Sequence, residues 1–204
     1  MNKQFYKDSL KMLFPIILQN IFAAMMGSVD VIMLNSVGQD AIAAGSLATQ
    51  YSGLVFMFYS GISSGSILLA AQYFGKKDFK ALEAIEGIAL KCSLAVAVAF
   101  SVGASLFPEK LMCVYTADPV LISEGAEYLR IIWVFYLLWA VSNTYFSMLR
   151  SANHVSVATF FNGVGFFLNI ILNAVFIFGF FGIEKMGIRG VALATCISQA
   201  VCVA

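Results

Sequence analysis

The chain has 204 residues, of which 61% are hydrophobic and 11% are charged, whereas roughly a quarter of an ordinary soluble domain is charged. The formal net charge of +1 gives no basic surface of the kind that binds nucleic acid. The four cysteines are separated singly along the chain, without the spacing of a disulfide framework or a metal site. The composition therefore excludes an ordinary soluble domain and predicts an integral membrane protein whose first partner is the lipid bilayer.

Six stretches of the sequence are long, apolar and poor in charge. A membrane span needs about 20 such residues, because about 30 Å of hydrocarbon is crossed at 1.5 Å per residue. The predicted spans are residues 12–34, 50–74, 84–107, 126–149, 155–181 and 186–204. The connections between them are short, so we expect an all-α membrane protein, a six-transmembrane-helix bundle.

Lysine and arginine are divided unevenly between the two sides of this bundle. They accumulate in the cytoplasmic loops of membrane proteins. Here they precede the first predicted span and follow the second and the fourth, as Lys3, Lys7, Lys11, Lys76, Lys77, Lys80 and Arg150. We therefore expect a cytoplasmic N-terminal segment at residues 1–11 and a six-span lobe at residues 12–204, in the cell (plasma) membrane. Because the last span ends without a charged flank, we expect this lobe to be truncated before a further part.

The first predicted span carries Asp30, the only acidic residue well inside a span. A charged group there costs about 3 kcal/mol on insertion scales. Gln19, Gly27 and Asp30 share one helical face, and such a stripe is expected to face a cavity or another helix. Pro15 removes a backbone donor, so the helix can bend there. Two plainer interpretations stay open, an interfacial or hydrogen-bonded Asp30 and an ordinary proline near a helix start.

Amide side chains line one face of the fifth predicted span. Asn162, Asn169 and Asn173 fall within about 40° of one another around the helix, and in lipid each amide must find a partner. Taken alone, the pattern favours hydrogen bonds between helices, which contribute about 0.6 kcal/mol each. Tyr128 lies near the outer end of the fourth predicted span, where a tyrosine usually anchors a helix at the interface.

Five stretches of the sequence resemble multidrug and toxic compound extrusion (MATE) transporters. They are, in chain order, PIILQNIFAAMMGSVDVIMLNSVGQDAIAAGSLATQ, GISSGSILLAAQYFGKKDFKAL, EYLRI, NIILNAVFIFG and GIRGVALAT. The resemblance implies an inverted-V fold of two six-helix lobes around a cavity that opens alternately to each side. This chain would be the N-terminal lobe, and the C-terminal lobe would be its missing partner. A self-paired dimer of half-transporters is the alternative.

The resemblance also implies a function, a secondary active multidrug efflux antiporter that exports organic cations in exchange for protons or sodium ions. It implies that the coupling ion and the substrate are held by Asp30, Asn169 and Asn173, with Tyr128 as a fourth residue and Pro15 as the conformational kink. A sodium ion would lie at Asp30, Asn169 and Asn173. Many relatives have an acid where Asn173 stands, which leaves Asp30 as the single titratable centre here.

Other functions stay open at this point. A lipid-linked oligosaccharide flippase of the same superfamily would line its cavity with cations to meet pyrophosphate, whereas these spans hold almost no interior lysine or arginine. A non-transporting membrane scaffold is a further alternative. An enzyme is disfavoured, because the sequence has no G-x-x-x-x-G-K-[ST] and no H-E-x-x-H motif. We expect no catalytic residues and no cofactor.

Overall fold

The structure is a computed structural model that describes residues 3–152, 154–182 and 184–204. These residues are helical almost throughout and include no β-strand, which confirms the predicted all-α fold. The helices are, in chain order, α1 (Lys3–Leu34), α2 (Gln39–Gly75), α3 (Phe79–Leu106), α4 (Pro108–Met112), α5 (Pro119–Ser151), α6 (Val155–Phe178), the 3-10 turn η1 (Phe180–Gly182) and α7 (Gly187–Val203).

Helices α1, α2, α3 and α5 begin earlier than their apolar stretches, so the connections before α2, α3 and α5 are shorter than expected. α2 begins at Gln39 rather than at residue 50, and α5 begins at Pro119 rather than at residue 126. Asp118 caps α5 by accepting a hydrogen bond from the Val120 backbone N–H at 2.9 Å, and a proline at the first helical position loses no backbone bond. Polar residues near the starts of these helices, Gln39 and Asp40 in α2 and Ser123 and Glu124 in α5, resemble a loop when only hydropathy is considered.

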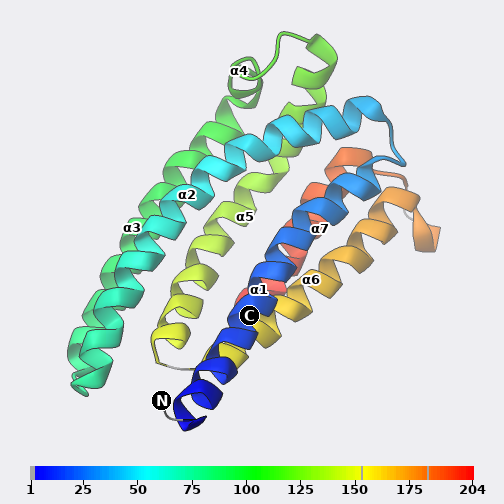
Figure 1. Cartoon of the computed structure of the whole chain (residues 1–204). Helices are drawn as coiled ribbons and strands as arrows, with labels where there is room; N and C mark the ends of the chain where they lie inside the picture. The colour runs from blue at the N-terminus through cyan, green and yellow to red at the C-terminus, as the bar shows by residue number, and fades with distance from the viewer. Residues whose placement is uncertain (1–2, 153, 183) are drawn as a thin grey trace.

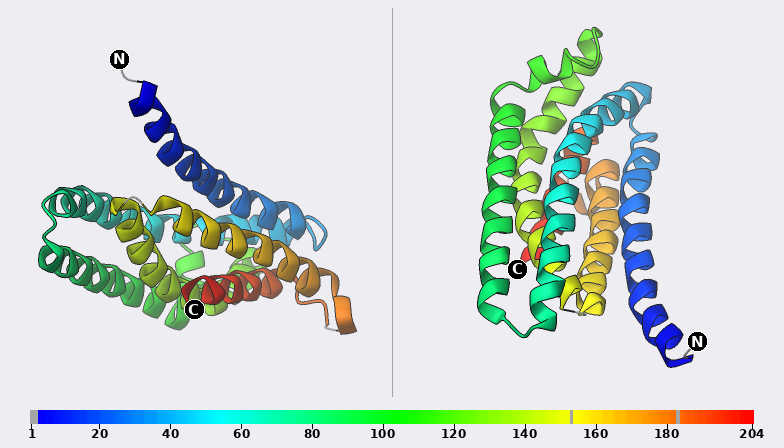
Figure 2. Two further views of the ribbon diagram at one scale, coloured as in Figure 1. Left: turned by 90° about the horizontal axis from the view of Figure 1, so that it is seen from below. Right: turned by 60° about the vertical axis from the view of Figure 1, so that its left-hand side comes forward.

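The helices form two groups that meet along α5. One group contains α2, α3 and α5, and the other contains α1, α6 and α7 (Figure 1). α5 packs against α2, α3 and α7, whereas α1 packs mainly on α6 and touches α2 little. Two further views show α1 standing beside the rest of the bundle (Figure 2). A cavity is lined by residues of α1, α2, α5 and α7.

The outer surface of the bundle is apolar. Large hydrophobic side chains point outward from several helices, among them Phe14, Met57, Leu68, Phe160 and Phe167. Contiguous apolar surface of this extent is rare on a soluble monomer. In the described part of the chain, five helices are long and apolar enough to cross a membrane, namely α1 from Leu13, α2, α3, α5 and α6. α7 is apolar but has 17 residues, so it is the shortest of the six predicted spans. The chain is therefore a multi-pass membrane protein.

The contact between α2 and α5 is held by hydrogen bonds as well as by apolar packing. Tyr59 donates from its hydroxyl to the Tyr136 carbonyl at 2.8 Å, and the Ser52 and Tyr136 hydroxyls lie 2.8 Å apart. All three side chains are buried. Because a buried hydroxyl without a partner is costly, these bonds fix how the two helices that line the site face each other.

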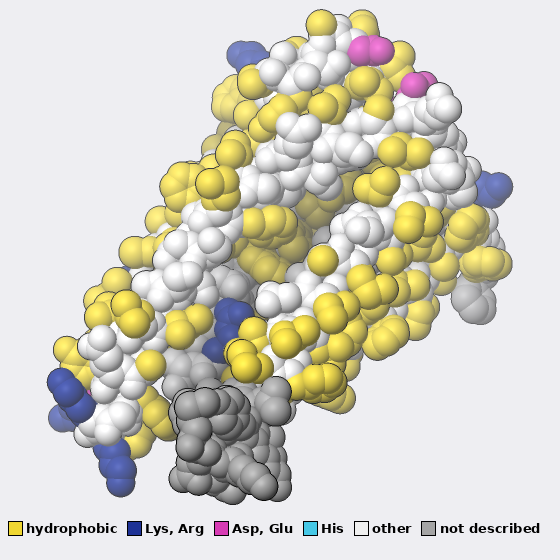
Figure 3. Space-filling model, in the orientation of Figure 1, with side chains coloured by type: hydrophobic (Ala, Val, Ile, Leu, Met, Phe, Trp, Pro, Cys, Tyr) yellow, Lys and Arg dark blue, Asp and Glu magenta, His cyan; other side chains and the backbone are white. Residues whose placement is uncertain are grey.

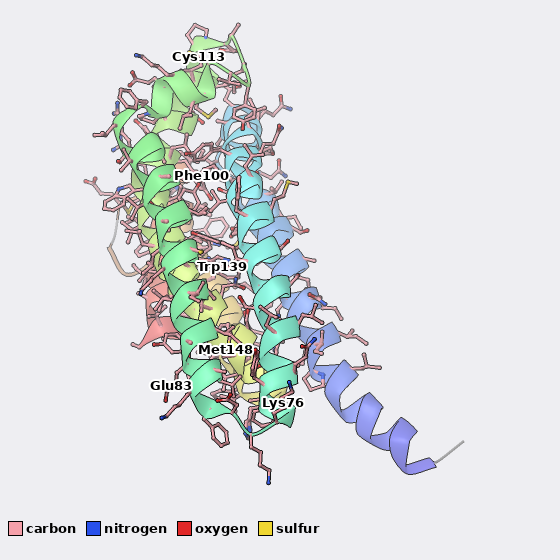
Figure 4. All side chains as sticks on the ribbon, turned by 90° about the vertical axis from the view of Figure 1, so that its left-hand side faces the viewer. Lys76, Glu83, Phe100, Cys113, Trp139 and Met148 are labelled. Atoms are coloured by element: carbon pink, nitrogen blue, oxygen red, sulfur yellow. The ribbon has the colours of Figure 1, made fainter. Side chains whose placement is uncertain are left out.

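The two ends of the bundle differ in charge. One end carries Lys76 at the end of α2 and Arg150 at the end of α5, and we call it the basic end. Figure 4 places Lys76, Glu83 and Met148 at this end and Cys113 at the opposite one. The opposite end carries most of the acids, which are Asp40, Glu109, Asp118, Glu124, Glu127 and Glu184. The site lies between these two ends.

Candidate functional site

A cavity of about 550 Å³ runs between α1, α2, α5 and α7. The space-filling view shows it as a hollow with hydrophobic side chains on its walls and a basic side chain near its lower end (Figure 3). The middle of the cavity is aromatic, with Phe56, Tyr59, Phe135 and Trp139. Phe56 and Phe135 each lie against Trp139, with ring centroids 5.6 and 5.5 Å apart. Such walls suit a flat aromatic guest.

Asp30 lines the cavity from α1 and is tied to α6. Its Oδ1 accepts a hydrogen bond from Asn173 Nδ2 at 2.5 Å. The same Nδ2 donates to Asn169 Oδ1 at 3.1 Å, and Asn169 Nδ2 donates to Thr195 Oγ1 on α7 at 3.2 Å. A continuous chain of hydrogen bonds therefore leads from the carboxylate at the cavity wall to α7. The structure thus brings together three of the residues predicted for the site.

The two asparagines behind Asp30 are fully buried. Asn173 Oδ1 has no hydrogen-bond partner among the described residues. A buried amide oxygen without a donor is unfavourable, and here it stands next to a carboxylate. Hard cations such as sodium prefer oxygen ligands of this kind. A proton on Asp30 would instead neutralise the carboxylate and change its hydrogen bonding with the Asn173 amide. The donor set therefore fits either predicted coupling ion.

Tyr128 lies on the same cavity wall, on α5. Its side chain is 5% exposed, so it faces the interior of the bundle rather than the lipid interface. The interpretation of Tyr128 as an interfacial anchor is therefore wrong. Its position beside the predicted ion site is compatible with the role that the family resemblance implies.

Asn162 and Pro15 lie away from the cavity. Asn162 donates to the Ala158 carbonyl of its own helix at 2.7 Å and takes no part in the chain of bonds from Asp30. Pro15 lies inside α1, which continues through it, and its carbonyl accepts a bond from the Thr159 hydroxyl at 3.2 Å. Gln19 donates to the same Thr159 Oγ1 at 2.8 Å. The residues around Pro15 thus fasten α1 to α6.

Comparison with known proteins bears directly on this arrangement. A family model described as MatE matches residues 15–175. The chain belongs to the MatE family. Members of this family are membrane transporters rather than enzymes.

Relatives of this MatE chain are considerably longer. It is 30% identical over 187 residues to the probable multidrug resistance protein YoeA of Bacillus subtilis, covering 91% of the chain and 40% of that protein. It is 25% identical to the probable multidrug resistance protein NorM of Thermotoga maritima, covering 95% of the chain and 42% of that protein. The chain therefore spans about two fifths of the length of the curated relatives it matches.

Solved MATE structures share the fold of this chain. A crystal structure of a MATE protein in the bent conformation matches 97% of the chain and 43% of its own length, with a TM-score of 0.87 at 20% identity. The bent form of the Vibrio cholerae MATE transporter VcmN matches 96% of the chain and 44% of its own length, with a TM-score of 0.86 at 18% identity. The six-helix bundle is therefore one part of the larger MATE fold.

Several cavity residues of this MatE chain were not anticipated from the sequence, among them Thr195 and Arg150. Thr195 joins α7 to the asparagines of α6, and the only signal for it is one hydroxyl within the run GVALAT. Arg150 looked like a charge that marks a loop, but the structure places it in the last turn of α5 and on the cavity wall. Hydropathy alone assigns such a residue to the water side.

Proposed function

We propose that this chain is the N-terminal six-span lobe of a secondary active multidrug efflux antiporter, residues 12–204 forming the lobe and residues 1–11 a cytoplasmic segment. Its transport cycle exports small organic cations in exchange for protons or sodium ions, and a C-terminal lobe is its missing partner. Support comes from relatives called probable multidrug resistance proteins and from the fraction of their length that the chain covers.

The observation that carries this proposal is the position of Asp30. Among the described residues it is the single acidic side chain on the cavity wall, and aromatic side chains line the same cavity. A negative charge attracts an organic cation, and aromatic faces add a cation–π attraction of about 0.5–2 kcal/mol. The walls of the cavity therefore suit flat, positively charged compounds.

Coupling follows from the same carboxylate. A proton on Asp30, or a sodium ion held by Asp30, Asn169 and Asn173, neutralises the charge that attracts the substrate. Ion and substrate then exclude each other, and this mutual exclusion is what an exchanger requires. The family resemblance implies that Tyr128 is a fourth residue of this site and that Pro15 is the conformational kink.

The function can be tested by ethidium efflux from inverted or right-side-out vesicles that contain the full-length protein. We expect an imposed proton or sodium gradient to drive ethidium transport, and collapse of that gradient with an ionophore to stop it. Vesicles without the protein are the control. Ethidium movement that ignores both gradients would contradict the antiport mechanism.

The charge asymmetry supports a cytoplasmic basic end, since cytoplasmic sides of membrane proteins are rich in lysine and arginine. Single cysteines at Gln39 and Asp118 should react with an impermeant maleimide added outside intact cells, and cysteines at Lys77 and His154 should react only after permeabilisation. All four positions are exposed at the ends of helices. The background is a variant without the four native cysteines. Labelling of Lys77→Cys in intact cells would reverse the orientation.

A further inference from the structure

We propose that the turn between α2 and α3, together with the outward side of the first half of α3, binds the headgroup of an anionic phospholipid. This inference concerns the outside of the bundle and does not depend on which compounds the cavity transports. We call this region the α3 basic surface. Its charged residues are Lys76, Lys77, Lys80 and Lys91.

The turn presents positive charge and aromatic rings side by side. Lys76 and Lys77 are exposed, and the side chain of Phe79, the first residue of α3, is 61% exposed. Lys76 Nζ lies 5.5 Å from the centroid of the Tyr73 ring. Figure 3 shows basic side chains gathered at this end of the molecule, at the lower left. Lysines beside aromatic side chains are typical of segments that lie at the level of the lipid headgroups.

The lysines of the α3 basic surface are not neutralised by acids of the described part of the chain. The two ion pairs that it forms join α5 to α4 and to α7, at the opposite end of the bundle. Asp78, the acid within the turn, caps α3 by accepting a hydrogen bond from the Ala81 backbone N–H at 3.1 Å. The positive charge of the turn is therefore available to an anion from outside the protein.

Lys80 and Lys91 lie on the same side of α3. Eleven positions separate them, which corresponds to about 16 Å along the helix axis and a difference of only about 20° around it. The acids Glu83 and Glu86 lie about 80° and 140° around the helix from Lys91. α3 packs against α2 and α5, and both lysines are exposed. They therefore form one strip on the outside of the bundle, away from the cavity, whose described lining includes no residue of α3.

The depth of Lys91 suits a contact with a headgroup. The end of α3 far from the turn is apolar, with Leu106 and the following Phe107 exposed. A span of about 20 residues counted back from Phe107 reaches Ile88, so Lys91 lies about one helical turn inside the hydrocarbon. Helical side chains tilt toward the N-terminus of their helix, which for α3 is the basic end. The Lys91 ammonium can therefore extend along the helix to the lipid phosphates.

An anionic phospholipid fits both the charges and the apolar part of this surface. Its headgroup meets the lysines, and its acyl chains run along the side of α3 on which Val98 and Val102 are exposed. A zwitterionic phospholipid carries a cation of its own next to the phosphate, so the lysines attract it less. A free phosphate ion would meet the charges but would leave the aromatic ring of Phe79 and the apolar side without a partner.

Quenching by brominated lipids tests this inference. The full-length protein without native cysteines carries Phe79→Cys labelled with bimane, so that a ring replaces a ring. It is reconstituted into phosphatidylcholine vesicles that contain a small fraction of either brominated phosphatidylglycerol or brominated phosphatidylcholine. We expect the anionic lipid to reach half-maximal quenching at a mole fraction about fivefold lower or more, because each lysine near the surface adds to the attraction. Inorganic phosphate added at millimolar concentration should not displace it.

The double variant Lys80→Gln/Lys91→Gln should remove most of this preference, an expected change of about fivefold. Lys80→Arg/Lys91→Arg keeps both charges and should keep the preference, which separates a loss of charge from misfolding. Lys110→Gln/Lys185→Gln is the matched control, because it removes two exposed lysines at the opposite end, and it should change nothing.

Three results would overturn the lipid site. They are equal quenching by the two brominated lipids in the wild type, an unchanged preference in Lys80→Gln/Lys91→Gln, and displacement of the lipid by inorganic phosphate. Both leaflets of these vesicles have the same composition, so the result does not depend on the orientation of the protein. No ion gradient and no ethidium are involved, so failure of the lipid site leaves the proposed efflux function standing.

Discussion

Asp30→Asn should strongly reduce ion-driven ethidium efflux while the protein still inserts and folds. Asparagine keeps the shape of the side chain and can still bond to Asn173, which now lies 2.5 Å from the carboxylate. It cannot gain or lose a proton, and it presents no charge to a cation. Because the proposed exchange depends on that one switchable charge, we expect the efflux rate to fall about tenfold or more, within the usual range of coupling free energies.

The measurement is the initial rate of efflux from energised vesicles at matched protein levels. Asp30→Glu restores the charge on a longer side chain and should keep part of the activity. Asp40→Asn is a matched control, because Asp40 is an exposed acid in the first turn of α2. An efflux rate equal to that of the wild type in Asp30→Asn would mean that Asp30 has only a structural role.

Asn173→Leu should impair both efflux and stability. It removes the donor to Asp30 and the bond to Asn169 Oδ1, and it leaves a half-buried carboxylate facing an apolar side chain. Loss of a partner by a buried polar group costs about 1–3 kcal/mol. We expect a lower unfolding temperature together with a strong loss of transport.

Thermal unfolding in detergent and vesicle efflux should be measured side by side for three leucine variants. Asn169→Leu breaks the bond to Thr195 and should resemble Asn173→Leu. Asn162→Leu removes only a bond within its own helix, so its effect should be small. Similar mild effects at all three positions would mean that these amides serve only to hold helices together.

The helical bundle and the polar residues of the site could be predicted from the sequence, because both leave a local pattern in it. A charge in an apolar stretch is conspicuous wherever the helix packs, and so Asp30 was found without knowledge of its neighbours. The side on which α1 meets α6 follows from the stripe that contains Gln19 and Asp30, since both residues bond to α6.

The position of a residue along its helix was harder to predict than the side of the helix on which it lies. Asn162 has nearly the same direction as Asn173, but 11 residues separate the two positions, or about 16 Å along the axis. It therefore lies too far along α6 to join the site. Arg150 was missed for a related reason, because hydropathy marks a charge as the end of a span, whereas α5 continues to Ser151 and carries the guanidinium into the cavity wall.

Helix α1 is attached to α6 at two places. One attachment involves only neutral groups, and the other involves a carboxylate that can gain or lose its charge. Near Pro15, neutral groups hold it through Thr159 and Gln19, and these bonds do not change with ion occupancy. Near its other end, the bond between Asp30 and Asn173 depends on the charge of one carboxylate. We propose that, when that bond is lost, α1 bends at Pro15, the predicted conformational kink. The arm of α1 that carries Asp30 would then move relative to α6, so that the charge of one carboxylate is coupled to the position of a cavity-lining helix.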